Sequence, residues 1–116
     1  MERGACSKFW NGVWVRMRLI AASTLAHFAA EHPDAATALD HWRGMVRAAQ
    51  WSSMQDVQAT AAKAKVLNGE RVRFEIAGGA YRLIAAIDFR LGIVFVKFIG
   101  SHAEYDRIDA LTVSKY

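Results

Sequence analysis

Three apolar segments separated by tight turns constrain the fold of this chain most strongly. In the first, Val72, Phe74 and Ile76 alternate with charged residues, as in a strand with one buried face. Short connections of this kind join antiparallel neighbours. The C-terminal half is therefore predicted to form a three-strand meander. Its segments are 71–76, 81–88 and 93–99, and its turn signals are Asn68-Gly69, Gly78-Gly79 and 90–92.

The residues before the predicted meander show one strand pattern followed by helical patterns. The apolar run 17–22 suits a strand, and Ser23 or Thr24 is placed to cap a helix that Pro33 should end nearby. Asp34 is the expected N-cap of a second helix over about 35–50. Its buried stripe is expected to contain Leu39, Trp42, Val46 and Ala49. A short helix followed by an irregular crossing is expected within 56–65.

The order of strand, helices and three strands predicts an α+β fold with the helices against one face of the sheet. At 116 residues the chain is of single-domain size. Cys6 is its only cysteine, so an intrachain disulfide is excluded and a reducing cytoplasm is the expected location. No Cys and His set has zinc-ligand spacing, and no apolar stretch is long enough for a membrane-spanning helix.

Basic residues are unevenly distributed along the chain. Residues 17–62 contain three Lys or Arg against four acidic residues, whereas 63–107 contain eight against five. The formal charge of +4 permits a polyanionic partner, and the excess lies on the predicted meander.

The first sixteen residues show neither a clean helical nor a clean strand period. Met17 opens a segment typical of a protein start, so 1–16 is interpreted as a leader, 17–110 as the folded domain and 111–116 as a tail that is free to move. The alternative is that 13–20 forms one extended edge strand.

The most specific segment is FIGSHAEYDRID at 98–109. It resembles the C-terminal signature of HigB-type toxins, in which the last strand ends in an apolar-Gly-Thr-His-x-Glu-Tyr-Asp run. Ser101 stands where Thr is usual and keeps the hydroxyl. Three further stretches resemble the same family in the same order: MRLIA at 17–21, HPD at 32–34 with Trp42 downstream, and YRLI at 81–84.

This resemblance implies a RelE-like fold over about 17–110. It also implies a toxin that cuts mRNA on the ribosome without a metal ion or other cofactor, and so inhibits translation. The implied partner is a HigA-like helix-turn-helix antitoxin, through which alone the chain would reach DNA. The alternative is a RelE-like module that binds RNA or protein without cutting, including a degenerate toxin that binds the antitoxin.

RNA cleavage needs a base, an acid and cations. His102 is the first candidate for proton transfer, as base or as acid, and Tyr105 lies one helical turn further on. The alternatives are a histidine that caps the turn after Gly100 and a half-buried tyrosine. Glu104 and Asp106 are secondary candidates, either as solvated carboxylates or as the group that orients His102.

The cations are expected from the meander. Arg82, on its middle strand, is assigned to the scissile phosphate, with an ion pair to Glu75 as the alternative. Lys97 is the only charge within 93–99 and is expected to join Arg82 in a two-cation phosphate site. Four further residues are predicted to follow the RNA backbone, although such side chains also cover ordinary exposed strands; they are Lys63, Lys65, Arg71 and Arg73.

Overall fold

The computed structural model describes residues 8–10, 13–15, 17–20 and 22–115. The first elements are β1 (Lys8–Trp10), β2 (Val13–Val15), β3 (Arg18–Ile20), α1 (Ala22–Glu31), α2 (Pro33–Ala48) and α3 (Met54–Thr60). They are followed by β4 (Lys65–Val66), β5 (Arg71–Ile76), a 3-10 turn at Ala77–Gly79, β6 (Tyr81–Asp88), β7 (Ile93–Ser101) and α4 (His102–Tyr105).

The central sheet has the strand order β3-β7-β6-β5-β4. β3 runs parallel to β7, and the other neighbours are antiparallel, which confirms the α+β class and the predicted meander. The register of β6 and β7 shifts between Ile84 and Ala85, which pair with Phe98 and Val96. Lys97 is therefore the extra residue of a β-bulge, so side chains on either side of it do not follow simple alternation.

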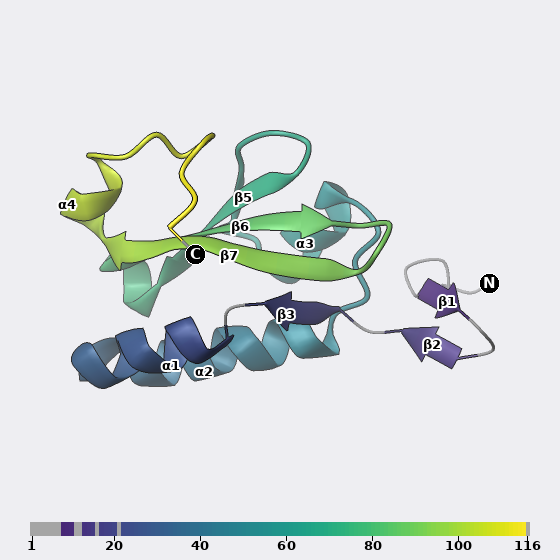
Figure 1. Cartoon of the computed structure of the whole chain (residues 1–116), viewed down its shortest axis with the longest axis horizontal. Helices are drawn as coiled ribbons and strands as arrows, with labels where there is room; N and C mark the ends of the chain where they lie inside the picture. Colours follow the sequence, from purple (N-terminus) through teal and green to yellow (C-terminus); the bar gives the residue numbers. More distant parts are fainter. Residues whose placement is uncertain (1–7, 11–12, 16, 21, 116) are drawn as a thin grey trace.

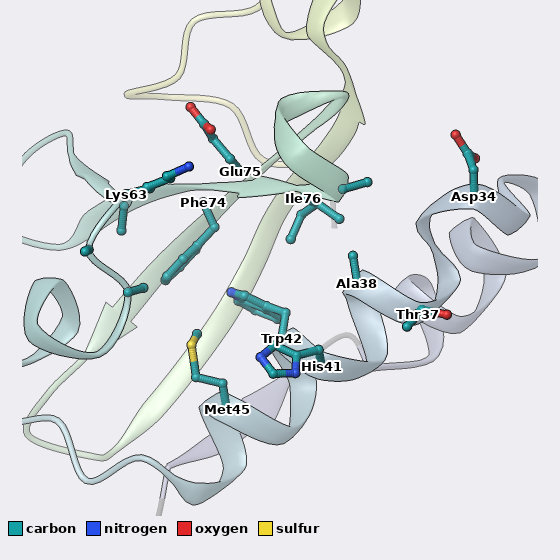
Figure 2. Close-up of a pocket in the computed structure, with 14 residues that line it drawn as sticks. Asp34, Thr37, Ala38, His41, Trp42, Met45, Lys63, Phe74, Glu75 and Ile76 are labelled. Atoms are coloured by element: carbon teal, nitrogen blue, oxygen red, sulfur yellow. The ribbon is translucent and has the colours of Figure 1, made fainter.

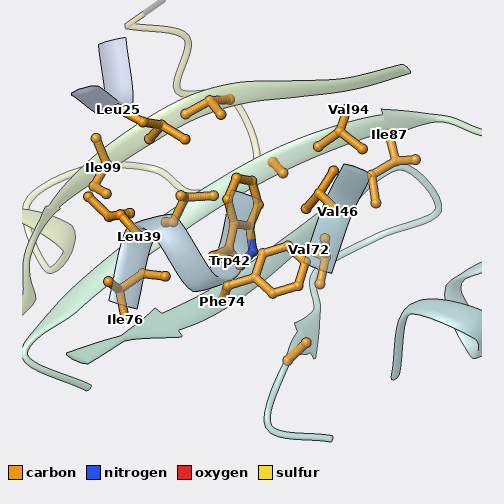
Figure 3. Packing of buried hydrophobic residues seen from close by; sticks show 14 of the residues in the cluster. Leu25, Leu39, Trp42, Val46, Val72, Phe74, Ile76, Ile87, Val94 and Ile99 are labelled. Atoms are coloured by element: carbon orange, nitrogen blue, oxygen red, sulfur yellow. The ribbon is translucent and has the colours of Figure 1, made fainter. Parts of the chain in front are cut away.

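Helices α1 and α2 lie against one face of this sheet (Figure 1). Between the two layers, apolar side chains from α2 meet alternate residues of β5, β6 and β7 (Figure 3). The ring of Trp42 meets that of Phe74 edge-on, with 5.3 Å between ring centres. Leu39, Trp42 and Val46 are buried as the helical spacing predicts, whereas Ala49 follows the end of α2 as its C-cap and is only partly buried. Among the described residues, no helix has the length and hydropathy needed to cross a membrane.

The start of α2 differs from the expectation. Pro33 is the first residue of the helix and follows His32 as N-cap, so Asp34 lies in the first turn and does not cap. Proline is well suited to this position because it lacks the N–H that would be unpaired there. The Asp34 carboxylate instead accepts a hydrogen bond from the hydroxyl of Tyr81 on β6, at 2.9 Å.

Residues 13–20 do not form one continuous strand. β2 pairs with β1 in a separate two-stranded sheet, and β3 pairs with β7 in the central sheet. The hairpin of β1 and β2 lies beyond the end of the central sheet in Figure 1. Cys6 falls outside the described residues, and the interpretation of Met17 as the start of the protein stays a prediction.

The C-terminal segment after α4 folds back over the sheet face opposite the helices (Figure 1). Arg71 Nη1 donates to the carbonyls of Ala110 and Val113, at 3.1 and 2.7 Å. The N–H of Lys115 donates to the carbonyl of Lys97, at 3.0 Å. In this structure the tail is thus docked on the sheet by contacts from two strands, rather than free as the sequence suggested.

Candidate functional site

The sheet face opposite α1 and α2, which we call the outer face, carries the arginines of the meander. Side chains alternate along a strand, and Val72, Phe74 and Ile76 point into the helix-covered core. Arg71 and Arg73 therefore point to the outer face. Arg82 joins them, because it lies opposite Glu75 in the pairing of β5 with β6. The register thus places three guanidinium groups on one surface.

Tyr105 from α4 lies beside two of these arginines. The guanidinium carbons of Arg73 and Arg82 are 5.6 and 5.4 Å from the centre of its ring. On the sheet, the ring of Phe98 is 6.5 Å from that of Tyr105, centre to centre. These distances fit cation–π contacts, which hold planar cations against the ring face.

A capping box holds α4 at the end of β7. The N–H of Glu104 donates to Ser101 Oγ at 3.2 Å, and the N–H of Ser101 donates to Glu104 Oε1 at 2.8 Å. The hydrogen bond from the Ser101 N–H is the largest cause that lowers the pKa of Glu104 from its usual value. Desolvation by burial raises this pKa and so opposes the effect in part. A Cβ at Gly100 would come within 2.8 Å of both Glu104 Oε1 and the Phe98 ring, so glycine is required at this close approach.

The two arginines keep unused hydrogen-bond donors. The Nε atoms of Arg73 and Arg82 are buried and have no hydrogen-bond partner among the described residues. Glu75 pairs with Arg73, at 3.7 Å between Nη2 and Oε2, and not with Arg82 across the hairpin. Desolvated guanidinium donors gain strongly from an anion that supplies acceptor oxygens. This corner of the outer face can therefore bind a phosphate group.

His102 lies at the first position of α4. Its Nδ1 is 3.3 Å from Oδ2 of Asp106, and the two side chains are 57% and 60% exposed. The carboxylate beside the imidazole is thus that of Asp106, whereas Glu104 is engaged by Ser101. Ser101, and not His102, supplies the cap of this turn. The His102 ring is accessible to a ligand on the same short helix that carries Tyr105.

Lys97 does not share a site with Arg82. The sheet register places Arg82 opposite Gly100, three residues from Lys97 along β7. Lys97 Nζ lies 5.4 Å from the centre of the Phe95 ring, at a hollow of about 440 Å³ that Asp88 also lines. The cation that shares the Tyr105 ring with Arg82 is Arg73, and not Lys97.

The other predicted RNA contacts lie in different environments. Arg71 is 9% exposed and holds the C-terminal segment, so its guanidinium is a structural group here and not a free surface charge. Lys65 is exposed on β4, opposite Arg73. Lys63 is exposed and lines a groove beside α2 (Figure 2).

Sequence reasoning missed Lys115. Its Nζ lies 5.8 Å from the centre of the Phe98 ring, which brings a further cation to the outer face. No local pattern marks this residue, because its position depends on the hydrogen bond that Arg71 donates to Val113 and on the one that the Lys115 N–H donates to the carbonyl of Lys97, and both partners are distant in sequence.

A comparison with protein families assigns a class to this fold and surface. Residues 35–108, more than half of the chain, match the model of the HigB toxin family, described as the RelE-like toxic component of a toxin–antitoxin system. The chain belongs to this family. A comparison with curated proteins found no match.

Proposed function

We propose that this chain is an endoribonuclease that cuts mRNA on the ribosome and so inhibits translation in the cytoplasm. A HigA-like helix-turn-helix antitoxin neutralises it and links it to DNA. The proposal rests on family membership and on one observation: Arg73 and Arg82 flank Tyr105 with buried Nε donors that have no acceptor among the described residues.

The arrangement suits cleavage through the 2′-hydroxyl of RNA. A base removes the 2′-OH proton, the 2′ oxygen bonds to phosphorus, and the bond from phosphorus to the 5′ oxygen breaks. An acid then protonates the leaving oxygen, which gives a 2′,3′-cyclic phosphate and a 5′-hydroxyl. Negative charge accumulates on the phosphate in the transition state, so two fixed guanidinium groups stabilise it more than the substrate. The protein supplies these cations itself, and the proposed reaction uses no metal ion.

His102 and Tyr105 are the proposed proton-transfer groups. An imidazole exchanges protons near neutral pH, and Asp106 beside Nδ1 favours the tautomer that leaves Nε2 free to accept a proton. The contacts of Tyr105 with two guanidinium groups also suit it to stack on a base next to the cut. Lys97 and Lys65 are proposed to contact the RNA backbone outside the scissile phosphate, as Lys115 is from the tail.

The test is cleavage of a translated mRNA in a reconstituted translation system, in EDTA-treated and untreated enzyme preparations. Arg82→Ala and His102→Ala should each slow cleavage by about 10²- to 10³-fold, the usual effect of removing one group that stabilises or protonates the transition state. Arg90→Ala is the matched control, because Arg90 is exposed in the turn between β6 and β7. It should cleave like the parent chain.

Several outcomes would change this proposal. If the folded parent chain binds RNA without cutting, the chain is a binding module. If it binds only the antitoxin and causes no growth arrest, it is a degenerate toxin. Full activity of His102→Ala would remove His102 from the mechanism and leave Tyr105 as the proton-transfer group.

A further inference from the structure

A second hollow lies on the other side of the sheet, between α2 and the edge of β5 (Figure 2). It has a volume of about 650 Å³. Its apolar wall includes Trp42 and Met45 from α2 and Phe74 and Ile76 from β5. The segment 61–64 closes one end. We call this hollow the α2–β5 groove.

The groove runs beside an unpaired part of β5. β4 has only two residues and pairs with Arg73 and Val72. The N–H and C=O of Arg71 point to this edge, because they bond to Asn68 Oδ1 and to the N–H of Leu67. Alternate residues of a strand direct their backbone groups to the same side, so those of Glu75 also point to this edge. The pairing of β4 with β5 ends at Arg73, and no other backbone hydrogen bond to the N–H or C=O of Glu75 is present among the described residues.

The charges around the groove differ from those of the outer face. Asp34 and Lys63, which carry opposite charges, line the groove, whereas the Glu75 side chain points to the outer face, where it pairs with Arg73. This mixture does not favour a nucleic acid, which needs a net positive surface. An apolar floor beside an open strand edge suits instead a peptide in extended conformation, whose backbone pairs with the edge while alternate side chains fill the groove.

We propose that the α2–β5 groove is the docking site for an extended segment of the antitoxin, which adds a strand to β5. Backbone groups of this segment pair with the N–H and C=O of Glu75, and its apolar side chains contact Met45 and Trp42. An acidic side chain faces Lys63. The inference rests on the proposed antitoxin, but not on RNA cleavage, because the groove and the pair Arg82 and Tyr105 lie on opposite faces of the sheet.

The strand pairing is tested with Glu75→Pro against Glu75→Ala. Both variants lose the ion pair with Arg73, but only proline removes the N–H that points to the open edge, and an edge position tolerates proline. We expect Glu75→Pro to bind the purified product of the adjoining antitoxin gene about tenfold more weakly than Glu75→Ala, measured by calorimetry. Equal affinities of the two folded variants would overturn strand addition.

The groove itself is tested with Met45→Lys against Ala48→Lys, two lysines on the same helix. Met45 lines the groove and Ala48 is exposed elsewhere on α2, so only the first should weaken binding, by about tenfold or more. Unchanged affinity of Met45→Lys would overturn the site, as would a dimer of the chain alone that Met45→Lys dissociates, since a second copy would then occupy the groove.

The same titration separates the two proposals. Arg82→Ala should bind the antitoxin like the parent chain, whether or not RNA cleavage depends on Arg82. An Arg82→Ala variant that loses antitoxin affinity as strongly as Met45→Lys would place the antitoxin on the outer face and overturn the groove assignment.

Discussion

The two faces of the central sheet are built from alternate residues of the same strands, yet they have different chemistry. On the helix side, Val72, Phe74 and Ile76 pack against α1 and α2 in a continuous apolar core. On the outer face their neighbours are Arg71, Arg73 and Glu75, and the cover is a short helix and a tail. The apolar core stabilises the fold, while the outer face leaves guanidinium donors available for a ligand.

A similar difference exists within the outer face. Arg71 and Arg73 are two residues apart and point the same way, but one is used by the chain itself. Arg71 is held by the carbonyls of Ala110 and Val113, whereas Arg73 keeps its Nε without a hydrogen-bond partner in the described part of the chain. Two neighbouring cations of one surface thus differ, because the chain itself binds the first and leaves the Nε donor of the second without an acceptor among the described residues.

The largest expected effect concerns Phe98 and Ile99, adjacent residues of β7 that are both buried but point to opposite faces. Ile99→Ala should lower the free energy of unfolding by about 2–5 kcal/mol, and Phe98→Ala should lower it by about 3–5 kcal/mol, as for other buried side chains. Phe98 contacts the docked tail, with Lys115 Nζ 5.8 Å from its ring centre, whereas Ile99 belongs to the helix-covered core. In an Arg71→Ala background the cost of Phe98→Ala should therefore fall, while that of Ile99→Ala stays the same. Urea unfolding of all the variants measures this, and equal coupling of both residues to Arg71 would mean that the tail does not cover the outer face specifically.

Arg71 itself gives the next effect. Arg71→Ala leaves two tail carbonyls without their donor and should lower the free energy of unfolding by about 1–3 kcal/mol. Arg73→Ala removes an ion pair between partly buried side chains and the contact with the Tyr105 ring, but leaves no carbonyl without its donor, and should change it by about 1 kcal/mol. Hydrogen exchange of the Lys115 amide is the sharper measurement, because it should accelerate in Arg71→Ala and not in Arg73→Ala. Similar acceleration in both would show that the two arginines are equivalent.

Much of the fold follows from local patterns. The strand Tyr81–Asp88 and the turns around it are predicted by period and glycine spacing, because one face of the sheet is fully apolar. The stripe of α2 follows equally well from its helical period. The start of α2 was wrong by two residues, because Asp34 and Pro33 are both typical of helix starts and the sequence does not show that Tyr81 engages Asp34.

The site is less accessible to such reasoning. Arg82 and Tyr105 were identified from strand position and family resemblance, and the structure brings them together. The bulge at Lys97 and the docking of the tail depend on long-range contacts, so the pairing of Arg82 with Lys97 and the exposure of Arg71 were wrong. Local periodicity does not record which of several cations on one face the chain uses for itself.

A substitution at Gly100 tests whether stability and activity depend on the position of α4 on the outer face. Gly100→Ala places a methyl group against the Phe98 ring and the Glu104 side chain, so α4 must move. We expect a loss of about 1–3 kcal/mol from overpacking, together with weaker RNA cleavage. Gly44→Ala, on α2 with open space around its Cβ, is the control and should keep both stability and activity. A Gly100→Ala protein with normal cleavage would show that the position of α4 matters little.

The smallest effect is the pH dependence of α4, and it separates the capping box from the rest of the outer face. The pKa of Glu104 is lowered from 4.5, mainly by the N–H of Ser101, so its charged form stabilises the folded state. This contribution is complete above pH 4.5 and is lost as the pH falls through the lowered value. Glu104→Gln keeps an acceptor for Ser101 but does not titrate. Hydrogen exchange of the Ser101 amide should therefore accelerate in acid more in the parent chain than in Glu104→Gln, after correction for the intrinsic rate. The same acceleration in both would assign the acid sensitivity of this corner to groups other than Glu104.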